Sequence, residues 1–248
     1  AIEVVHASKS HKGIVWIGLE YRYMGTISAT LNNLNAVGNI RMCAIREHRF
    51  PFLKKVGNWN RFNRNTGGTL VEKCCHFFDL MNQVISSEPE SVFASGGQDV
   101  NHLDEVIDGE TPDIIDNAYV IVNYANGARA LLDLCMFAEG SEYEQEIAVT
   151  GDIGKIETTV PGNELIISNR SKNDFKKILI NKDSRIKEQG FHHGASYLEH
   201  LGFLDAIKNK TSPEVTVNDG LMSIVLGIAA QESIATGKLV KIADLLKG

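Results

Sequence analysis

Apolar residues recur at three- and four-residue spacing in five parts of the chain, which predicts amphipathic helices there. The predicted helices span residues 2–10, 26–36, 70–85, 197–208 and 221–236. Gly38 is placed to end the second helix and Gly237 the last, because glycine readily adopts the left-handed conformation that closes many helices. Asn218 or Asp219 would cap the front of the last helix.

Short apolar or alternating runs predict strands between these helices. Residues 14–18 form an apolar run bounded by glycines, typical of a buried strand. Further strands are expected at residues 40–46, 91–96, 117–124, 128–137, 142–150, 154–159, 164–168 and 175–180. Asn126-Gly127 is a strong hairpin signal. The order predicts an α+β fold with a largely antiparallel open sheet and helices packed on one face.

Composition narrows the class of protein. The chain has 248 residues, 43% hydrophobic content and a net charge of −6, which suits a globular protein and gives no basic footprint for nucleic acid. The longest uncharged apolar stretch, residues 221–230, is too short to span a membrane, so we expect no membrane partner. Four cysteines fit no disulfide framework or Cys-x-x-Cys site, which predicts free thiols in a reducing cytoplasm.

Candidate chemistry lies at the start of the helix predicted over residues 70–85. Gly67 and Gly68 open it, and Glu72 and His76 stand four residues apart just inside it. That spacing places a carboxylate and an imidazole on one helix face, which suits general acid–base chemistry. On an exposed helix the same pair is usually a solvated ion pair of little energetic value, so spacing alone leaves both interpretations open.

Two flanking segments could recognise a ligand. The loop over residues 47–66 carries Trp59 and Asn60 among several arginines, which suits polar ligands, although an ordinary solvated connection explains it equally well. His192 and His193 precede Tyr197 at the start of the helix predicted over residues 197–208. No carboxylate or cysteine lies near them at metal-ligand spacing, so contacts to a hydroxylated substrate, or a plain helix start, are favoured over a metal site.

Common nucleotide-binding motifs are absent from the sequence. No two glycines are two positions apart, which excludes a Gly-x-Gly-x-x-Gly dinucleotide fingerprint. No phosphate-binding loop of the Gly-x-x-x-x-Gly-Lys type occurs either. The chain itself therefore offers no recognised cofactor motif.

The whole pattern resembles the C-terminal portion of the glucose–fructose oxidoreductase, inositol dehydrogenase and MocA (Gfo/Idh/MocA) family. The resemblance begins at residues 13–23, which look like that family's last Rossmann strand and its exit, and continues through residues 67–80. Residues 116–118, 126–127, 151–154, 203–207 and 213–220 match further landmarks in the same order. Nearly the whole chain is covered.

The resemblance implies NAD(P)-dependent oxidation of a sugar, cyclitol or related polyol, with site residues carried over by position. His76 would be the acid/base and Glu72 its carboxylate partner, while Trp59, Asn60, His193 and Tyr197 would contact the substrate. Glu72 replaces the family's usual aspartate, and Cys74 stands where a glycine is frequent. The family's Glu-Lys-Pro motif does not occur in the chain.

The resemblance also implies a domain division. Residues 1–20 would be the last helix and strand of a Rossmann domain, and residues 21–248 a C-terminal α+β domain for substrate binding and oligomerisation. The parent protein would bind NAD or NADP, whereas this chain alone would bind neither tightly and would be inactive. We expect a homo-oligomer joined through the open sheet face. The alternative is a non-catalytic oligomerisation or sugar-binding module derived from the same family.

Overall fold

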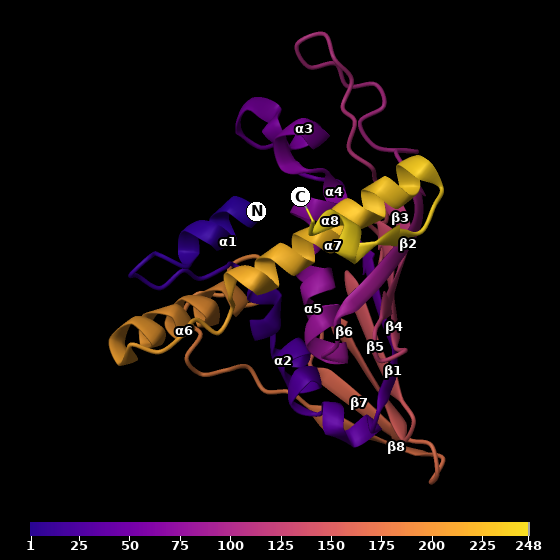
Figure 1. Cartoon of the computed structure of the whole chain (residues 1–248). Helices are drawn as coiled ribbons and strands as arrows, with labels where there is room; N and C mark the ends of the chain where they lie inside the picture. Colours follow the sequence, from indigo (N-terminus) through magenta and orange to yellow (C-terminus); the bar gives the residue numbers. More distant parts are fainter. Residues whose placement is uncertain (248) are drawn as a thin grey trace.

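The computed structural model describes residues 1–247 and has one mixed sheet with helices on one side (Figure 1). The strands are β1 Ile40–His48, β2 Pro89–Gly97, β3 Asn117–Tyr124, β4 Arg129–Cys135, β5 Gln145–Gly151, β6 Gly154–Val160, β7 Glu164–Asn169, β8 Asp174–Leu179 and β9 Val240–Lys241. The α-helices are α1 Ile2–Ser8, α2 Gly25–Asn32, α3 Asn63–Thr66, α4 Thr69–Glu72, α5 Cys75–Ile85, α6 Ala195–Asn209, α7 Val217–Thr236 and α8 Ile242–Leu245. Three 3₁₀ helices join them: η1 Glu20–Tyr23, η2 Leu34–Val37 and η3 Val56–Arg61.

The strands follow the order β8-β7-β6-β5-β1-β4-β3-β2-β9 across the sheet. Every neighbouring pair is antiparallel except β1 and β4, which run parallel. β1 therefore lies between two hairpin-built halves, β2 to β4 on one side and β5 to β8 on the other. The predicted α+β class, with a largely antiparallel open sheet, is confirmed.

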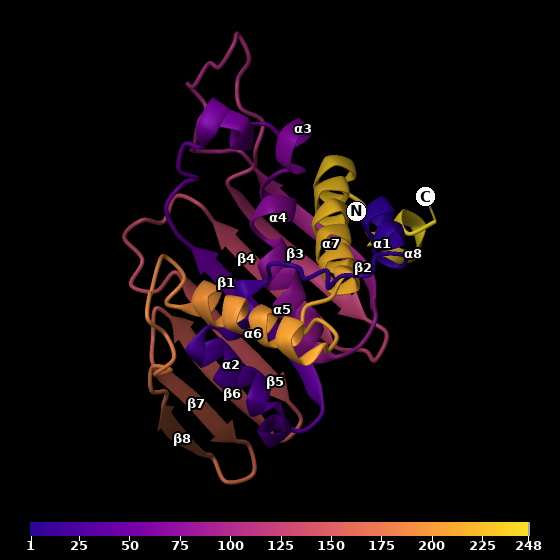
Figure 2. The ribbon, with the colours of Figure 1, turned by 90° about the vertical axis from the view of Figure 1, so that its left-hand side faces the viewer.

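Side-chain alternation explains which face of the sheet is covered. In β3, Ala118, Val120 and Val122 are buried, whereas Tyr119 and Ile121 point to the other face and are exposed. Successive strand residues point to opposite faces, so one face carries the core and the other faces solvent. Figure 2 shows α2, α5, α6 and α7 in front of the covered face.

The core forms where α5 and α7 pack on the sheet. α5 contributes Phe77, Phe78 and Met81, and α7 contributes Leu226 and Ala230, all of them fully buried. Burying large aromatic and aliphatic side chains is the main favourable term in folding. α5, which carries the candidate acid–base residue, is therefore anchored in the hydrophobic core.

The N-terminal segment differs from its prediction. Residues 14–17 are half-buried and Gly18 is exposed, but they form no strand; the Ile17 amide bonds to the Val215 carbonyl (3.2 Å), and its carbonyl accepts only from nearby Leu19 (3.0 Å). Within residues 1–247 no strand lies alongside them to complete a ladder, and a lone extended segment is not a strand. The helix predicted over residues 2–10 is present as α1. The assignment of residues 1–20 to a Rossmann domain stays a prediction.

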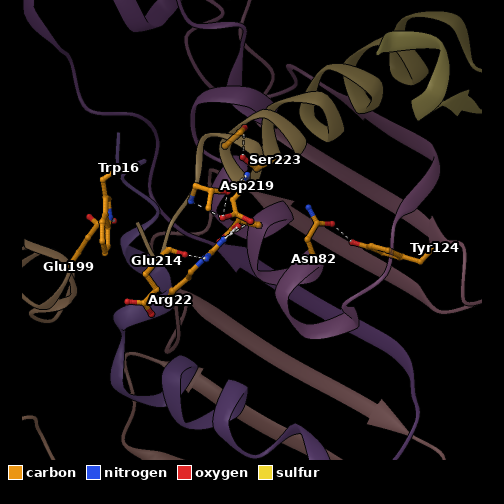
Figure 3. Close-up of polar contacts among 11 residues, drawn as sticks. Trp16, Arg22, Asn82, Tyr124, Glu199, Glu214, Asp219 and Ser223 are labelled. Carbon is orange, nitrogen blue, oxygen red and sulfur yellow. Dashed lines mark hydrogen bonds and ion pairs between the residues drawn. The ribbon is translucent and has the colours of Figure 1, made fainter. Parts of the chain in front are cut away.

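Polar side chains fasten this segment to the helices (Figure 3). Trp16 donates its indole N–H to Glu199 of α6 at 3.3 Å. Arg22 makes a two-point ion pair with Asp79 of α5, at 2.7 and 2.5 Å, and lies 3.5 Å from Asp219 of α7. Because Arg22 and Asp79 are nearly fully buried, η1 is fixed in position against α5.

Helix boundaries bring three further corrections. The helix predicted over residues 26–36 is divided into α2 and η2, and Gly38 ends η2 with a φ of 78°. The helix predicted over residues 70–85 is divided into α4 and α5. Thr216, and neither Asn218 nor Asp219, caps α7; Asp219 completes the reciprocal capping box, and Gly237 ends the helix as predicted.

Candidate active site

The break between α4 and α5 determines what surrounds His76. The amide of Cys74 bonds to the carbonyl of Thr69, five residues back, at 3.2 Å, so the helical ladder is widened at this point. α5 then restarts at Cys75 with its own hydrogen bonds. Such local π-type widening often occurs at functional sites. The simple rule that residues four apart share a helix face does not hold across this widened turn.

Glu72 and His76 are not brought together. Glu72 instead accepts a hydrogen bond from Lys55 Nζ at 2.5 Å, and Lys55 also lies 5.1 Å from the centre of the Trp59 ring. No ion pair or hydrogen bond joins Glu72 to His76 in the part of the chain that the structure describes. The expected Glu72–His76 contact is therefore wrong in this structure, because the helix is interrupted and a lysine from the preceding loop binds the carboxylate.

His76 has a different carboxylate beside it. Its Nδ1 lies 3.7 Å from Glu20 Oε2, and its ring stacks on Tyr21 with centroids 4.7 Å apart. His192, from the segment before α6, places its own Nδ1 3.5 Å from Glu20 Oε1. Glu20 comes from η1, so three distant segments meet at this point.

A buried ionic cluster packs against the Tyr21 ring on which His76 stacks. Lys73 Nζ donates to the Tyr21 hydroxyl at 2.6 Å and lies 3.1 Å from Glu47 Oε1. Burial alone would lower the pKa of Lys73, but the Glu47 carboxylate and the Tyr21 hydroxyl together outweigh it and raise that pKa, so Lys73 is a cation. Burial raises the pKa of Tyr21, which keeps its hydroxyl neutral. The cluster thereby fixes the ring on which His76 rests.

Electrostatics favour a neutral imidazole. Burial lowers the pKa of His76 to about 4, against the opposing influence of Glu20 and with help from the positive charges of Lys73 and His192. At neutral pH His76 therefore has a free lone pair and can accept a proton. A neutral histidine can act as a general base by accepting a proton at its free nitrogen.

The four predicted substrate contacts fall in different places. Trp59 is exposed (41%), whereas Asn60 is fully buried and donates to the Leu53 carbonyl at 3.0 Å, which braces the loop. His193 is exposed and lines a surface cavity of about 890 Å³ whose lining does not include His76. Tyr197 is half-buried in the first turn of α6. His192, the neighbour of the predicted His193, is the histidine that reaches the His76 cluster.

Several residues of this cluster were not predicted as site residues: Glu20, Tyr21, Glu47, Lys73 and His192. Glu20 and Tyr21 lie in the segment that the resemblance assigns to the exit from the last Rossmann strand, with no role at the site. The one available signal was a charged lysine, Lys73, within a run of apolar positions. A buried lysine requires a carboxylate partner, but the sequence does not say which one.

The described residues offer no arrangement typical of a metal site and no dinucleotide fingerprint. Across residues 1–247 no group of three or more His, Cys, Asp or Glu side chains is arranged to hold a metal ion. The sequence has no Gly-x-Gly-x-x-Gly turn, the usual fingerprint of a dinucleotide site. Within the same span, no helix is both long and apolar enough to cross a membrane. The four cysteines are free thiols, as predicted.

Comparisons with known proteins agree with the fold. Residues 33–242 match the model of the Gfo/Idh/MocA family described as "Oxidoreductase family, C-terminal alpha/beta domain". A relative from Thermotoga maritima, myo-inositol 2-dehydrogenase, is 30% identical over 190 residues, which are 74% of this chain and 52% of that protein. The chain thus spans about half the length of this curated relative.

Two solved structures share the fold. An oxidoreductase from Agrobacterium radiobacter in complex with NAD⁺, L-tartaric acid and magnesium matches with a TM-score of 0.80 and 16% identity, over 98% of this chain and 69% of that one. Levoglucosan dehydrogenase in complex with NADH and levoglucosan matches with a TM-score of 0.79 and 18% identity, over 96% and 68%. At these identities the likeness establishes the fold alone.

Proposed function

The chain belongs to the Gfo/Idh/MocA oxidoreductase family, and on that premise we propose that it is the substrate-binding part of an NAD(P)-dependent oxidoreductase. The substrate is a sugar, cyclitol or related polyol. The name of the Thermotoga maritima relative supports the substrate class, and the NAD⁺ and NADH complexes of the structural neighbours support the cofactor.

The observation that carries the proposal is His76 itself: a neutral, largely buried imidazole with a carboxylate at one nitrogen and an aromatic ring beneath it. In this proposal the other nitrogen, Nε2, takes the proton of the substrate hydroxyl. A bound NAD(P)⁺ would supply the nicotinamide as hydride acceptor for the carbon that carries this hydroxyl. The residues of this chain bind the substrate and handle only the proton.

Glu72 has a revised place in this scheme. Lys55 holds its carboxylate and also lies over the Trp59 ring. We place Glu72, together with Trp59, among the groups that bind substrate hydroxyls. Asn60, His193 and Tyr197 stay predicted contacts, and Asn60 would have to become accessible before it could act as one.

Self-association through the open sheet face is part of the proposal. Phe93, Ile121 and Leu131 lie in register on adjacent strands and are each 36–42% exposed. They form an apolar row across β2, β3 and β4 on the face that the helices leave uncovered. A second copy of the chain would bury this row, since contiguous exposed apolar residues commonly mark an interface.

Replacing His76 tests the catalytic role. In the complete protein that contains this chain, His76→Ala should lower kcat for polyol-dependent NAD(P)⁺ reduction by about two to four orders of magnitude, the usual contribution of a general base. His200→Ala, which removes an exposed imidazole from α6, is the matched control and should leave kcat near normal. A near-normal kcat in His76→Ala would remove His76 from the mechanism. Polyol binding without any turnover in the unmodified protein would favour the alternative, a non-catalytic module.

A further inference from the structure

Glu20 lies between two imidazoles. Its Oε2 faces Nδ1 of His76 at 3.7 Å, and its Oε1 faces Nδ1 of His192 at 3.5 Å. The Glu20 side chain is only 13% exposed, while His76 is 17% and His192 is 40% exposed. The carboxylate is therefore sheltered from solvent, with one oxygen directed at each ring.

Nδ1 of His76 is buried and has no hydrogen-bond partner among residues 1–247. An unpaired buried nitrogen is costly, and Glu20 supplies the carboxylate within ion-pair distance of it. A closure of less than 1 Å would turn the 3.7 Å separation into a hydrogen bond of ordinary length. Catalytic hydrogen bonds are often long in ligand-free structures and shorten when substrate binds.

We propose that Glu20 is the positioning residue of His76. Its carboxylate accepts a hydrogen bond from the Nδ1–H group. The neutral imidazole therefore keeps its lone pair on Nε2, the nitrogen directed away from Glu20. The position of the proton on Nδ1 does not depend on the proposed function. Only the role of Nε2 as the acceptor of a substrate proton rests on it. When a substrate hydroxyl gives its proton to Nε2, the ring becomes an imidazolium and the negative charge of Glu20 stabilises it.

Other charges around the pair adjust this effect. Lys73 and, when protonated, His192 place positive charge near His76, which disfavours the imidazolium. Glu199, on α6, adds negative charge near Glu20. Tyr21 and Cys75, also in contact with the site, have raised pKa values and stay neutral. Since His192 shares the Glu20 carboxylate, its protonation weakens the support that Glu20 gives to His76.

The test measures which ring nitrogen of His76 carries the proton. Imidazole ¹⁵N chemical shifts of the full chain at pH 7 should show His76 protonated on Nδ1, whereas a free histidine favours Nε2. This measurement needs no variant. Glu20→Gln should move the His76 proton toward Nε2 and raise the acid dissociation constant of His76 about tenfold or more, because a carboxylate at this distance favours the charged ring. Glu157→Gln is the matched control, because Glu157 lies on β6 and pairs with Lys155, and it should leave both readings unchanged.

Kinetics of the complete protein separate the two proposals. Glu20→Gln should lower kcat at least about tenfold with little change in KM, and should shift the pH profile of kcat. If His76 carries its proton on Nε2 in the unmodified chain, or if Glu20→Gln leaves the ¹⁵N shifts unchanged, the positioning role is wrong even where the protein oxidises polyols. If the ¹⁵N shifts behave as expected and no polyol is oxidised, the positioning role stands and the proposed function is wrong.

Discussion

Acidification should destabilise the folded chain through His76. Burial lowers the pKa of this histidine from 6.5 to about 4 in the folded state, whereas the unfolded chain titrates at the ordinary value. Between pH 6.5 and pH 4 the unfolded state therefore binds more protons than the folded state. The stability contributed by the neutral imidazole is fully present above about pH 6.5 and is lost as the pH falls toward 4.

The two pKa values set the size of the effect. The gap between 6.5 and about 4, at about 1.4 kcal/mol for each pKa unit, predicts that His76 accounts for a loss of about 3 kcal/mol in the free energy of unfolding between pH 7 and pH 4. For a domain with a typical stability of about 5–15 kcal/mol, that is a large fraction. The side chain is only 17% exposed, so solvent screens the effect little.

Urea unfolding at pH 7, 5.5 and 4.5, followed by circular dichroism, measures this loss. His76→Phe keeps a ring against Tyr21 but cannot titrate, so its stability should fall by about 2 kcal/mol less than that of the unmodified chain between pH 7 and pH 4.5. Any constant packing cost of phenylalanine cancels, because only the dependence on pH is compared. If the variant and the unmodified chain lose the same unfolding free energy as the pH falls, His76 titrates at its ordinary pKa in the folded chain and the reasoning is refuted.

Two further predictions concern the ion pair at η1 and the open sheet face. Asp79→Ala leaves the buried Arg22 guanidinium without its two-point partner and should lower the free energy of unfolding by about 3–5 kcal/mol in urea titrations; a loss below about 1 kcal/mol would mean that the pair does not hold η1 in place. Ile121→Lys puts a charge in the apolar row and should give a monomer by light scattering, while Val106→Lys, in an exposed loop, should not change the assembly. An unchanged oligomer in Ile121→Lys would place the contact between copies elsewhere.

The sheet could be predicted because each strand carries its own signal. In β6, buried Ile156, Thr158 and Val160 alternate with outward residues, and that two-residue period is readable without knowing any neighbour. The segment at residues 14–18 has an equally clear apolar run, yet it forms no strand. An apolar run indicates that a segment will be buried. It does not indicate whether neighbouring strands or, as here, two helices will bury it.

The candidate site could be predicted only in part, and the reason lies in one lysine. The four-residue spacing of Glu72 and His76 implies contact only if the helix between them is continuous. Lys73 stands inside that interval, and its ammonium group is drawn into the core by Glu47 and Tyr21, at the point where the helix breaks. The contact that replaces it, Glu20 with His76, joins residues more than fifty positions apart. Local spacing singles out the imidazole as a chemical candidate, but the carboxylate that lies beside it is determined by tertiary packing. A buried charge beside a catalytic motif is therefore a reason to doubt pairings inferred from helical spacing across it.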